Sequence, residues 1–144
     1  MPLPKISTPT YELELPSSGK KIKYRPFLVK EEKILILALE GENIKQITTS
    51  VKSTLKDCIL TRGVKIDNLP IFDIEYLFLN VRGKSVSEAL DLIVTCPDDG
   101  KTTVPVKVYI DEIQVVKDEK HSQDIKLDDK LTLRLKYPSL DEFI

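Results

Sequence analysis

The chain has 144 residues, of which 41% are hydrophobic and 31% charged, and its formal net charge is −1 at pH 7. This length corresponds to one domain, and frequent apolar residues with balanced charge exclude intrinsic disorder as the main state. The longest uninterrupted apolar run, residues 34–39, is far shorter than the roughly 18 residues that a membrane span needs. Residues 1–5 lack the apolar segment of a secretory signal, so we expect a cytoplasmic protein that does not act at a membrane.

The N-terminal part predicts an extended arm followed by a β-hairpin. Residues 1–10 contain three prolines, which favour an extended conformation. Residues 11–15 and 21–24 alternate apolar and polar side chains on either side of a Pro-Ser-Ser-Gly turn. The first strand carries glutamates and the second carries lysines, so cross-strand charges favour the pairing.

Three segments have helical patterns. Residues 29–40 begin with acids and hold a near-continuous apolar run, which predicts a helix buried on more than one side, with a buried strand as the alternative. Residues 43–60 repeat apolar side chains at steps of three and four, and Cys58 on this stripe is interpreted as a small core residue. A third helix opens near Pro70 and is expected to stop at residues 82–84. Its aromatic residues are interpreted as core packing, with a docking surface as the alternative.

After this helix the pattern becomes β. Residues 90–96 and 102–110, joined by a turn, predict an antiparallel pair, and residues 113–116 are a further candidate strand. Pro105 indicates an edge strand, because proline cannot donate to a ladder. Residues 131–137 alternate cleanly and predict a last strand.

The end of the chain predicts the start of a helix, because Ser139 and Glu142 have the spacing of a capping box. We expect this helix to continue in a longer protein, and a stub packed on the body is the alternative. The expected organisation is an arm at 1–10, a single α+β domain at 11–137, and a helix start at 138–144. The α+β domain comprises the N-terminal hairpin, two to three central helices and then antiparallel strands.

The sequence offers no catalytic constellation, so we expect no enzyme activity, no cofactor and no bound metal. The single histidine, His121, lies in a charged, loop-like stretch. Residues 96–100 are similar to one knuckle of a zinc ribbon, with Asp99 where a second cysteine would stand. Since a structural zinc needs four ligands, a plain hairpin turn is favoured. A metal or enzyme site built from Cys96, Asp99 and His121 is the alternative.

Charge is uneven along the chain. Residues 1–30 hold six Lys and Arg against two acids, whereas residues 98–130 hold nine acids against six Lys. These blocks are short and mixed, which favours protein partners over nucleic acid. The remaining alternative is a nucleic-acid-binding module that uses four basic residues of the first hairpin: Lys20, Lys21, Lys23 and Arg25.

Two long strings carry a family resemblance: GKKIKYRPFLVKEEK at residues 19–33 and FDIEYLFLNVRGKS at 72–85, followed by CPDDG at 96–100. Over most of residues 10–140, the chain resembles the T4-type bacteriophage baseplate hub protein family. The resemblance implies a non-enzymatic role in building the central hub of a contractile-tail baseplate. It implies other hub proteins as partners, and the host cytoplasm or the virion baseplate as the location. A transient assembly chaperone that is absent from the mature virion is the alternative to a lasting subunit.

We expect the arm, the 11–25 hairpin or the edge carrying Pro105 to contact another hub protein, since an open edge can accept a strand. Alanine at Tyr11, Tyr24 or Phe27 is expected to weaken hub assembly more than folding. The candidate partner-binding residues are Tyr11, Tyr24, Arg25, Phe27 and Pro105.

Overall fold

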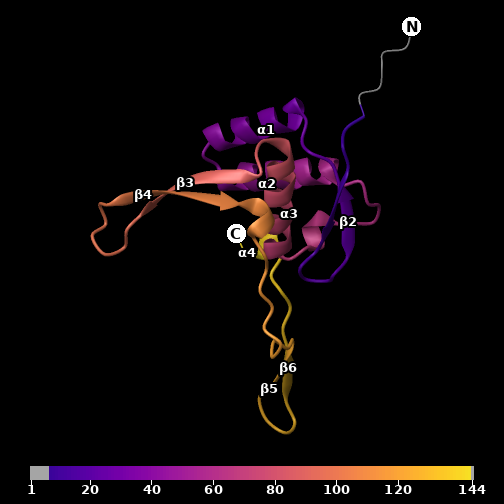
Figure 1. Cartoon of the computed structure of the whole chain (residues 1–144). Coiled ribbons are helices and arrows are strands. Elements are labelled where there is room, and N and C mark those ends of the chain that lie inside the picture. The colour runs from indigo at the N-terminus through magenta and orange to yellow at the C-terminus, as the bar shows by residue number, and fades with distance from the viewer. Residues whose placement is uncertain (1–6, 144) are drawn as a thin grey trace.

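The computed structural model describes residues 7–143 and shows a small α+β body from which two hairpins project in different directions (Figure 1). The helices and strands are β1 (Tyr11–Glu14), β2 (Lys21–Tyr24), α1 (Val29–Glu40), α2 (Ile44–Cys58), η1 (Ile66–Asn68), α3 (Ile71–Ser85), β3 (Ala89–Thr95), β4 (Thr103–Tyr109), η2 (Ile110–Glu112), β5 (Asp124–Lys126), β6 (Thr132–Arg134) and α4 (Leu140–Phe143). The strands form three antiparallel pairs, β1–β2, β3–β4 and β5–β6. The predicted α+β order is therefore confirmed. Part of the predicted arm lies outside the described residues, and residues 7–10 have no regular secondary structure.

The core forms where β2, α2 and α3 meet. Apolar side chains on the two helices recur at steps of three and four, so each helix turns one stripe inward. Ile22 and Tyr24 alternate with exposed lysines on β2, which turns one face of the first hairpin toward the body. The members of the core cluster are Tyr24, Leu55, Cys58, Ile66, Ile74, Leu77 and Val81.

The first hairpin has the predicted register and is tied to α3 through its turn. Glu12 lies opposite Lys23 and Glu14 opposite Lys21, so the complementary charges face each other as expected. The carboxylate of Asp73 on α3 is fully buried and accepts hydrogen bonds from the Ser17 backbone N–H, at 2.9 Å, and from the Ser17 hydroxyl. A buried carboxylate that is satisfied by a distant turn fixes that turn on the body.

A buried ion pair fixes the entry to α1. Glu31 Oε1 lies 2.9 Å from Arg25 Nη2, and their side chains are 1% and 13% exposed. Glu31 Oε2 also accepts the Leu28 backbone N–H at 2.8 Å, which satisfies a donor at the helix start. Burial alone would raise the pKa of Glu31, but hydrogen bonds from Arg25, Leu28 and Lys30 outweigh it and lower the pKa to about 2.

We expect this ion pair to make folding pH-dependent. The pKa of Glu31 falls from 4.5 to about 2 on folding, so its stabilisation is fully present above about pH 4.5. As the pH drops from there toward 2, the unfolded state takes up the proton first and the stabilisation is lost. Urea unfolding at a series of pH values should show a falling midpoint in acid. The Glu31→Gln variant should be less stable at neutral pH and should show a smaller acid loss, and an equal loss in both proteins would contradict the assignment.

The β region differs from the prediction at two places. Residues 113–116 form no strand, because the backbone turns through η2 and then runs on as irregular chain. The partner of β6 is β5, a strand that the sequence pattern does not predict. In addition, α3 continues through Gly83 to Ser85. Gly83 is buried, and a Cβ there would lie 3.0 Å from Ile110 Cδ1, so the glycine permits close packing rather than ending the helix.

The predicted helix start is present at α4, but only the glutamate half of the capping box forms, because the Ser139 hydroxyl donates to Glu142 Oε2 instead of accepting the Glu142 N–H. The Ser139 backbone N–H donates to Glu142 Oε2 at 2.9 Å, and the Glu142 N–H bonds back to the Ser139 carbonyl at 3.1 Å. Lys52 of α2 bridges to Asp141 at 2.6 Å, which holds the short helix against the body.

The two cysteines have different environments. Cys58 is fully buried in the core as predicted, whereas Cys96 is partly exposed at the end of β3. Burial raises the pKa of the Cys58 thiol to about 11, so it is poorly nucleophilic in the folded protein. We expect an alkylating reagent to label Cys96 in the native state and Cys58 only after unfolding. Mass spectrometry of the labelled peptides checks this, and native labelling of Cys58 would contradict its core position.

Candidate partner-binding surfaces

Helix α1 exposes most of its apolar residues. Val29 is 80% exposed, Leu39 61%, Leu37 57% and Ile36 50%, whereas only Glu31 and Ala38 are buried. The prediction that this helix is buried on more than one side is therefore wrong. The reason is that α1 lies at the outside of the body and packs along α2, with no further layer above it (Figure 1). Several exposed large aliphatic side chains on one helix are typical of an interaction surface.

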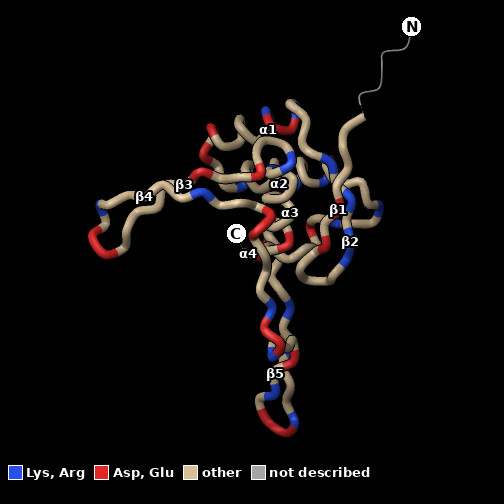
Figure 2. The backbone as a smooth tube through the Cα atoms, in the orientation of Figure 1, with Lys and Arg blue, Asp and Glu red and all other residues tan. Residues whose placement is uncertain are grey.

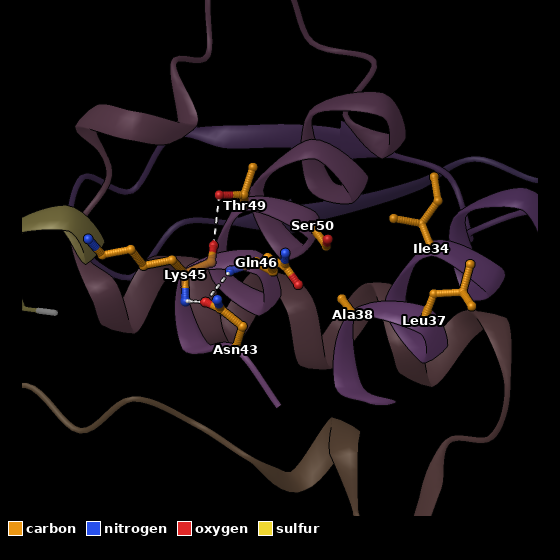
Figure 3. Close-up of a pocket in the computed structure, with 8 residues that line it drawn as sticks. All are labelled: Ile34, Leu37, Ala38, Asn43, Lys45, Gln46, Thr49 and Ser50. Atoms are coloured by element: carbon orange, nitrogen blue, oxygen red, sulfur yellow. Dashed lines mark hydrogen bonds between the residues drawn. The ribbon is translucent and has the colours of Figure 1, made fainter. Parts of the chain in front are cut away.

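A groove between α1 and α2 adjoins this face (Figure 3). Its volume is about 510 Å³, with an apolar wall from α1 and a polar wall from the first turns of α2. Two groups of the polar wall are held by local hydrogen bonds: Asn43 Oδ1 accepts the Lys45 and Gln46 backbone N–H groups, and the Thr49 hydroxyl donates to the Lys45 carbonyl. The lining residues are Ile34, Leu37, Ala38, Asn43, Lys45, Gln46, Thr49 and Ser50.

The β3–β4 ribbon carries a second apolar surface. Alternate cross-strand pairs place only aliphatic side chains on one face and a mixed set on the other. The aliphatic residues toward the tip, Leu92, Val94, Val104 and Val106, are about half exposed. An isolated two-stranded ribbon is marginally stable in water, so such a face is expected to meet another surface. The aliphatic pairs are Leu90–Val108, Leu92–Val106 and Val94–Val104.

The β5–β6 hairpin repeats this arrangement. Ile125 lies opposite Leu133, and Leu127, Leu131 and Leu135 continue the same apolar face, all about half exposed. The other face is charged, and Arg134 binds the Asp124 carboxylate with two hydrogen bonds of 2.7 and 2.9 Å.

The sequence-predicted contact residues lie in two separate places. Tyr24 is only 2% exposed, so its side chain packs in the core and is not free to contact a partner. This corrects its predicted role, and alanine at Tyr24 is now expected to weaken folding. Tyr11 packs on the Tyr24 ring at 5.8 Å between centroids, and Phe27 stacks on Phe78 at 6.4 Å.

The other candidates stay untested as contacts. Arg25 is engaged with Glu31. The rings of Tyr11, in the first hairpin, and Phe27, which follows it, are half-buried against the core, which leaves part of each ring exposed. Pro105 is exposed on β4, and both strands of its two-stranded sheet have a free edge.

The residues of the alternative metal site lie on two different hairpins. Asp99 closes the β3–β4 turn, where hydrogen bonds from Thr102 and from the Lys101 and Thr102 N–H groups lower its pKa to about 2. His121 stacks on Tyr137 at the base of the β5–β6 hairpin, and its Nε2 lies 2.7 Å from the Tyr137 hydroxyl. Within residues 7–143, no group of three or more His, Cys, Asp or Glu side chains is placed to hold a metal ion.

The basic residues of the alternative nucleic-acid site do not act as one free patch. Lys21 pairs with Glu12 at 3.6 Å, and Arg25 is held by Glu31. Figure 2 shows acidic and basic positions mixed over the body and along both hairpins. Among the helices of the described part of the chain, none is long and apolar enough to cross a membrane.

A small domain with several exposed apolar surfaces is typical of a subunit of a larger protein assembly. The comparisons identify the assembly. The family model described as T4 bacteriophage base plate protein matches residues 8–144, so the chain belongs to this family and is a phage base plate protein. The expected resemblance to a T4-type baseplate family is thereby confirmed, and its partners are other base plate components. The comparison with curated proteins gave no match, and the comparison with solved structures gave none.

Proposed function

We propose that this base plate protein is a non-enzymatic component or assembly factor of the central hub, and that it acts through protein–protein contacts. The observation that carries the proposal is the exposed apolar face of α1. Its four most exposed aliphatic side chains, Val29, Ile36, Leu37 and Leu39, are each at least half exposed. A lone subunit gains nothing by exposing them, whereas a partner that covers them removes apolar area from water at roughly 25 cal/mol per Å².

Two further observations support a role in protein–protein contacts rather than in catalysis or metal binding. The projecting ribbons extend the reach of the body and each carries an aliphatic face. Two of the polar residues considered for catalysis or metal binding are instead engaged structurally, Asp99 in the β3–β4 turn and His121 in stacking on Tyr137. The assignment to the hub, as opposed to another part of the base plate, is supported by the two long strings at residues 19–33 and 72–85 that resemble hub proteins.

Inactivation of the gene in the phage tests the proposal. We expect infected cells to accumulate incomplete base plates that lack the hub, and expression of the wild-type chain in trans should restore complete particles. Incomplete base plates with a normal hub would contradict a hub role. Proteomics of purified virions then separates the two forms of the proposal, because a subunit remains in the particle and a transient assembly factor does not.

A further inference from the structure

Both edges of the β3–β4 ribbon are free, but they differ in how many backbone N–H groups they can donate. Hydrogen bonds from the Cys96 N–H to the Thr102 carbonyl (2.8 Å) and from the Ile110 N–H to the Glu88 carbonyl (2.9 Å) fix the pattern of the ladder. Alternation then directs the backbone groups of the odd-numbered residues outward on both strands. On β4 this outward row contains Pro105, which has no N–H to donate and blunts that edge. The outward row of β3 contains no proline, so β3 presents the more complete edge.

The β6 strand of the other hairpin also has a free edge. The Leu127 N–H donates to the Leu131 carbonyl (3.0 Å), and the Leu135 N–H donates to the Gln123 carbonyl (2.8 Å). The odd-numbered residues of β6 therefore face β5, and the even-numbered residues direct their backbone groups outward. These outward residues are Thr132 and Arg134 in β6, and Lys136 just beyond it.

The edges of β3 and β6 are complementary in charge at one antiparallel register. Placing Asp91 opposite Arg134 aligns the outward backbone groups of both strands in hydrogen-bonded pairs. Asp91 already faces Lys107 across the ribbon, with 3.6 Å between the charged atoms, and Arg134 already binds Asp124. The pairing would therefore line up Lys107, Asp91, Arg134 and Asp124 across the strands β4, β3, β6 and β5. Their charges alternate in sign, which favours this register.

The same register also joins the two apolar faces. In an antiparallel pair, residues directly opposite each other have side chains on the same face of the sheet. Each non-hydrogen-bonded pair between β3 and β6 would then place two aliphatic side chains opposite each other. These pairs would join the apolar face of the β3–β4 ribbon to that of the β5–β6 hairpin. These pairs are Leu90–Leu135, Leu92–Leu133 and Val94–Leu131.

Neighbouring registers fit less well. A shift of two residues in one direction places Pro138 opposite Ala89, in a row where each residue should supply an N–H. A shift of two residues in the other direction places Thr132 opposite Asp91, which removes the ion pair. A shift of one residue moves every side chain to the wrong face.

We propose that two copies of this chain associate by antiparallel pairing of β3 in one copy with β6 in the other, with Asp91 opposite Arg134. Two copies are required because the two hairpins of one chain project in different directions (Figure 1). The contact is heterologous and leaves one β3 edge and one β6 edge free, so it generates a ring or a longer chain of copies. This interface goes beyond the proposed hub function, and either statement can fail without the other.

Charge reversal in the purified full chain tests the interface. We expect the wild-type chain to associate in sedimentation velocity as its concentration rises. Asp91→Lys alone and Arg134→Glu alone should each weaken association at least about tenfold, because like charges would face each other. An equal mixture of the two variants should associate again, since each copy then meets an opposite charge. A wild-type chain that stays monomeric up to its solubility limit would overturn the proposal, and so would variants that associate like the wild type.

Cross-linking provides a second readout that does not depend on charge. In a Cys96→Ser background, copies with Leu92→Cys are mixed with differently tagged copies with Leu133→Cys under mild oxidation. We expect a disulfide between the two tagged chains. The matched control replaces Leu92→Cys by Ile93→Cys, which places the thiol on the opposite face and should give no disulfide. Equal yields from both pairs would overturn the register. A chain that carries both Leu92→Cys and Leu133→Cys but closes only within itself would overturn the pairing between copies.

Discussion

Replacing Leu37 and Leu39 of α1 by glutamate is expected to abolish the capture of base plate partners while the chain stays folded. Both side chains are more than half exposed, so charges there cost the isolated chain little. In a complex they would be buried without a partner charge, which costs far more than the roughly 1.4 kcal/mol that changes affinity tenfold. We therefore expect recovery of partners from infected cells to fall by about tenfold or more.

The control for this variant lies on the same helix. Glu32 and Lys33 are exposed and polar, and their replacement by glutamine changes the charge of the helix but leaves all of its aliphatic side chains in place. Capture by this control should match that of the wild type. If the Leu37→Glu, Leu39→Glu variant shows a normal circular dichroism spectrum and still captures the same proteins, then the face of α1 is not the binding surface.

Replacing the buried Glu31 by alanine is expected to lower the free energy of unfolding more than replacing any exposed residue of α1. The change leaves the guanidinium of Arg25 without its carboxylate and the Leu28 N–H without its acceptor. Removing one partner of a buried pair costs roughly 3–5 kcal/mol, which approaches the whole stability of a small domain. Urea unfolding followed by circular dichroism measures this loss.

Two comparisons make the Glu31 result specific. Alanine at the adjacent, exposed Glu32 should change the free energy of unfolding by less than about 0.5 kcal/mol. A double variant, Arg25→Met with Glu31→Leu, should recover much of the lost stability, since an apolar pair often replaces a buried ion pair at little cost. Equal losses from Glu31→Ala and Glu32→Ala would show that the ion pair does not hold the start of α1.

Much of the fold could be predicted from local patterns. The first hairpin follows from its alternation and turn, and α2 follows from apolar residues at steps of three and four with Asn43 as its cap. The β3–β4 pair and the helix start at Ser139, where Glu142 accepts the Ser139 N–H, are equally local features. Strand β5 escaped prediction because it has three residues, two of them charged, and becomes a strand through its pairing with β6.

The binding surfaces were harder to predict because exposure depends on what surrounds an element. The apolar run of α1 resembles a buried helix by composition, and only the arrangement of α2 beside it shows that one side stays open. Tyr24 shows the reverse error, since an aromatic residue at the end of a short strand looks accessible until α2 and α3 close over it. A signal was present in the sequence: charged residues such as Glu32 and Lys33 lie among the apolar residues of this helix, and such residues are almost never fully buried without a partner.

The most direct test of the account is a capture experiment with the tagged, full-length chain in phage-infected cells, followed by quantitative mass spectrometry. We expect other hub proteins of the base plate to be recovered with the wild-type chain and to be strongly depleted with the Leu37→Glu, Leu39→Glu variant. Recovery of no tail protein at all, or recovery of base plate proteins from outside the hub alone, would contradict the proposed function.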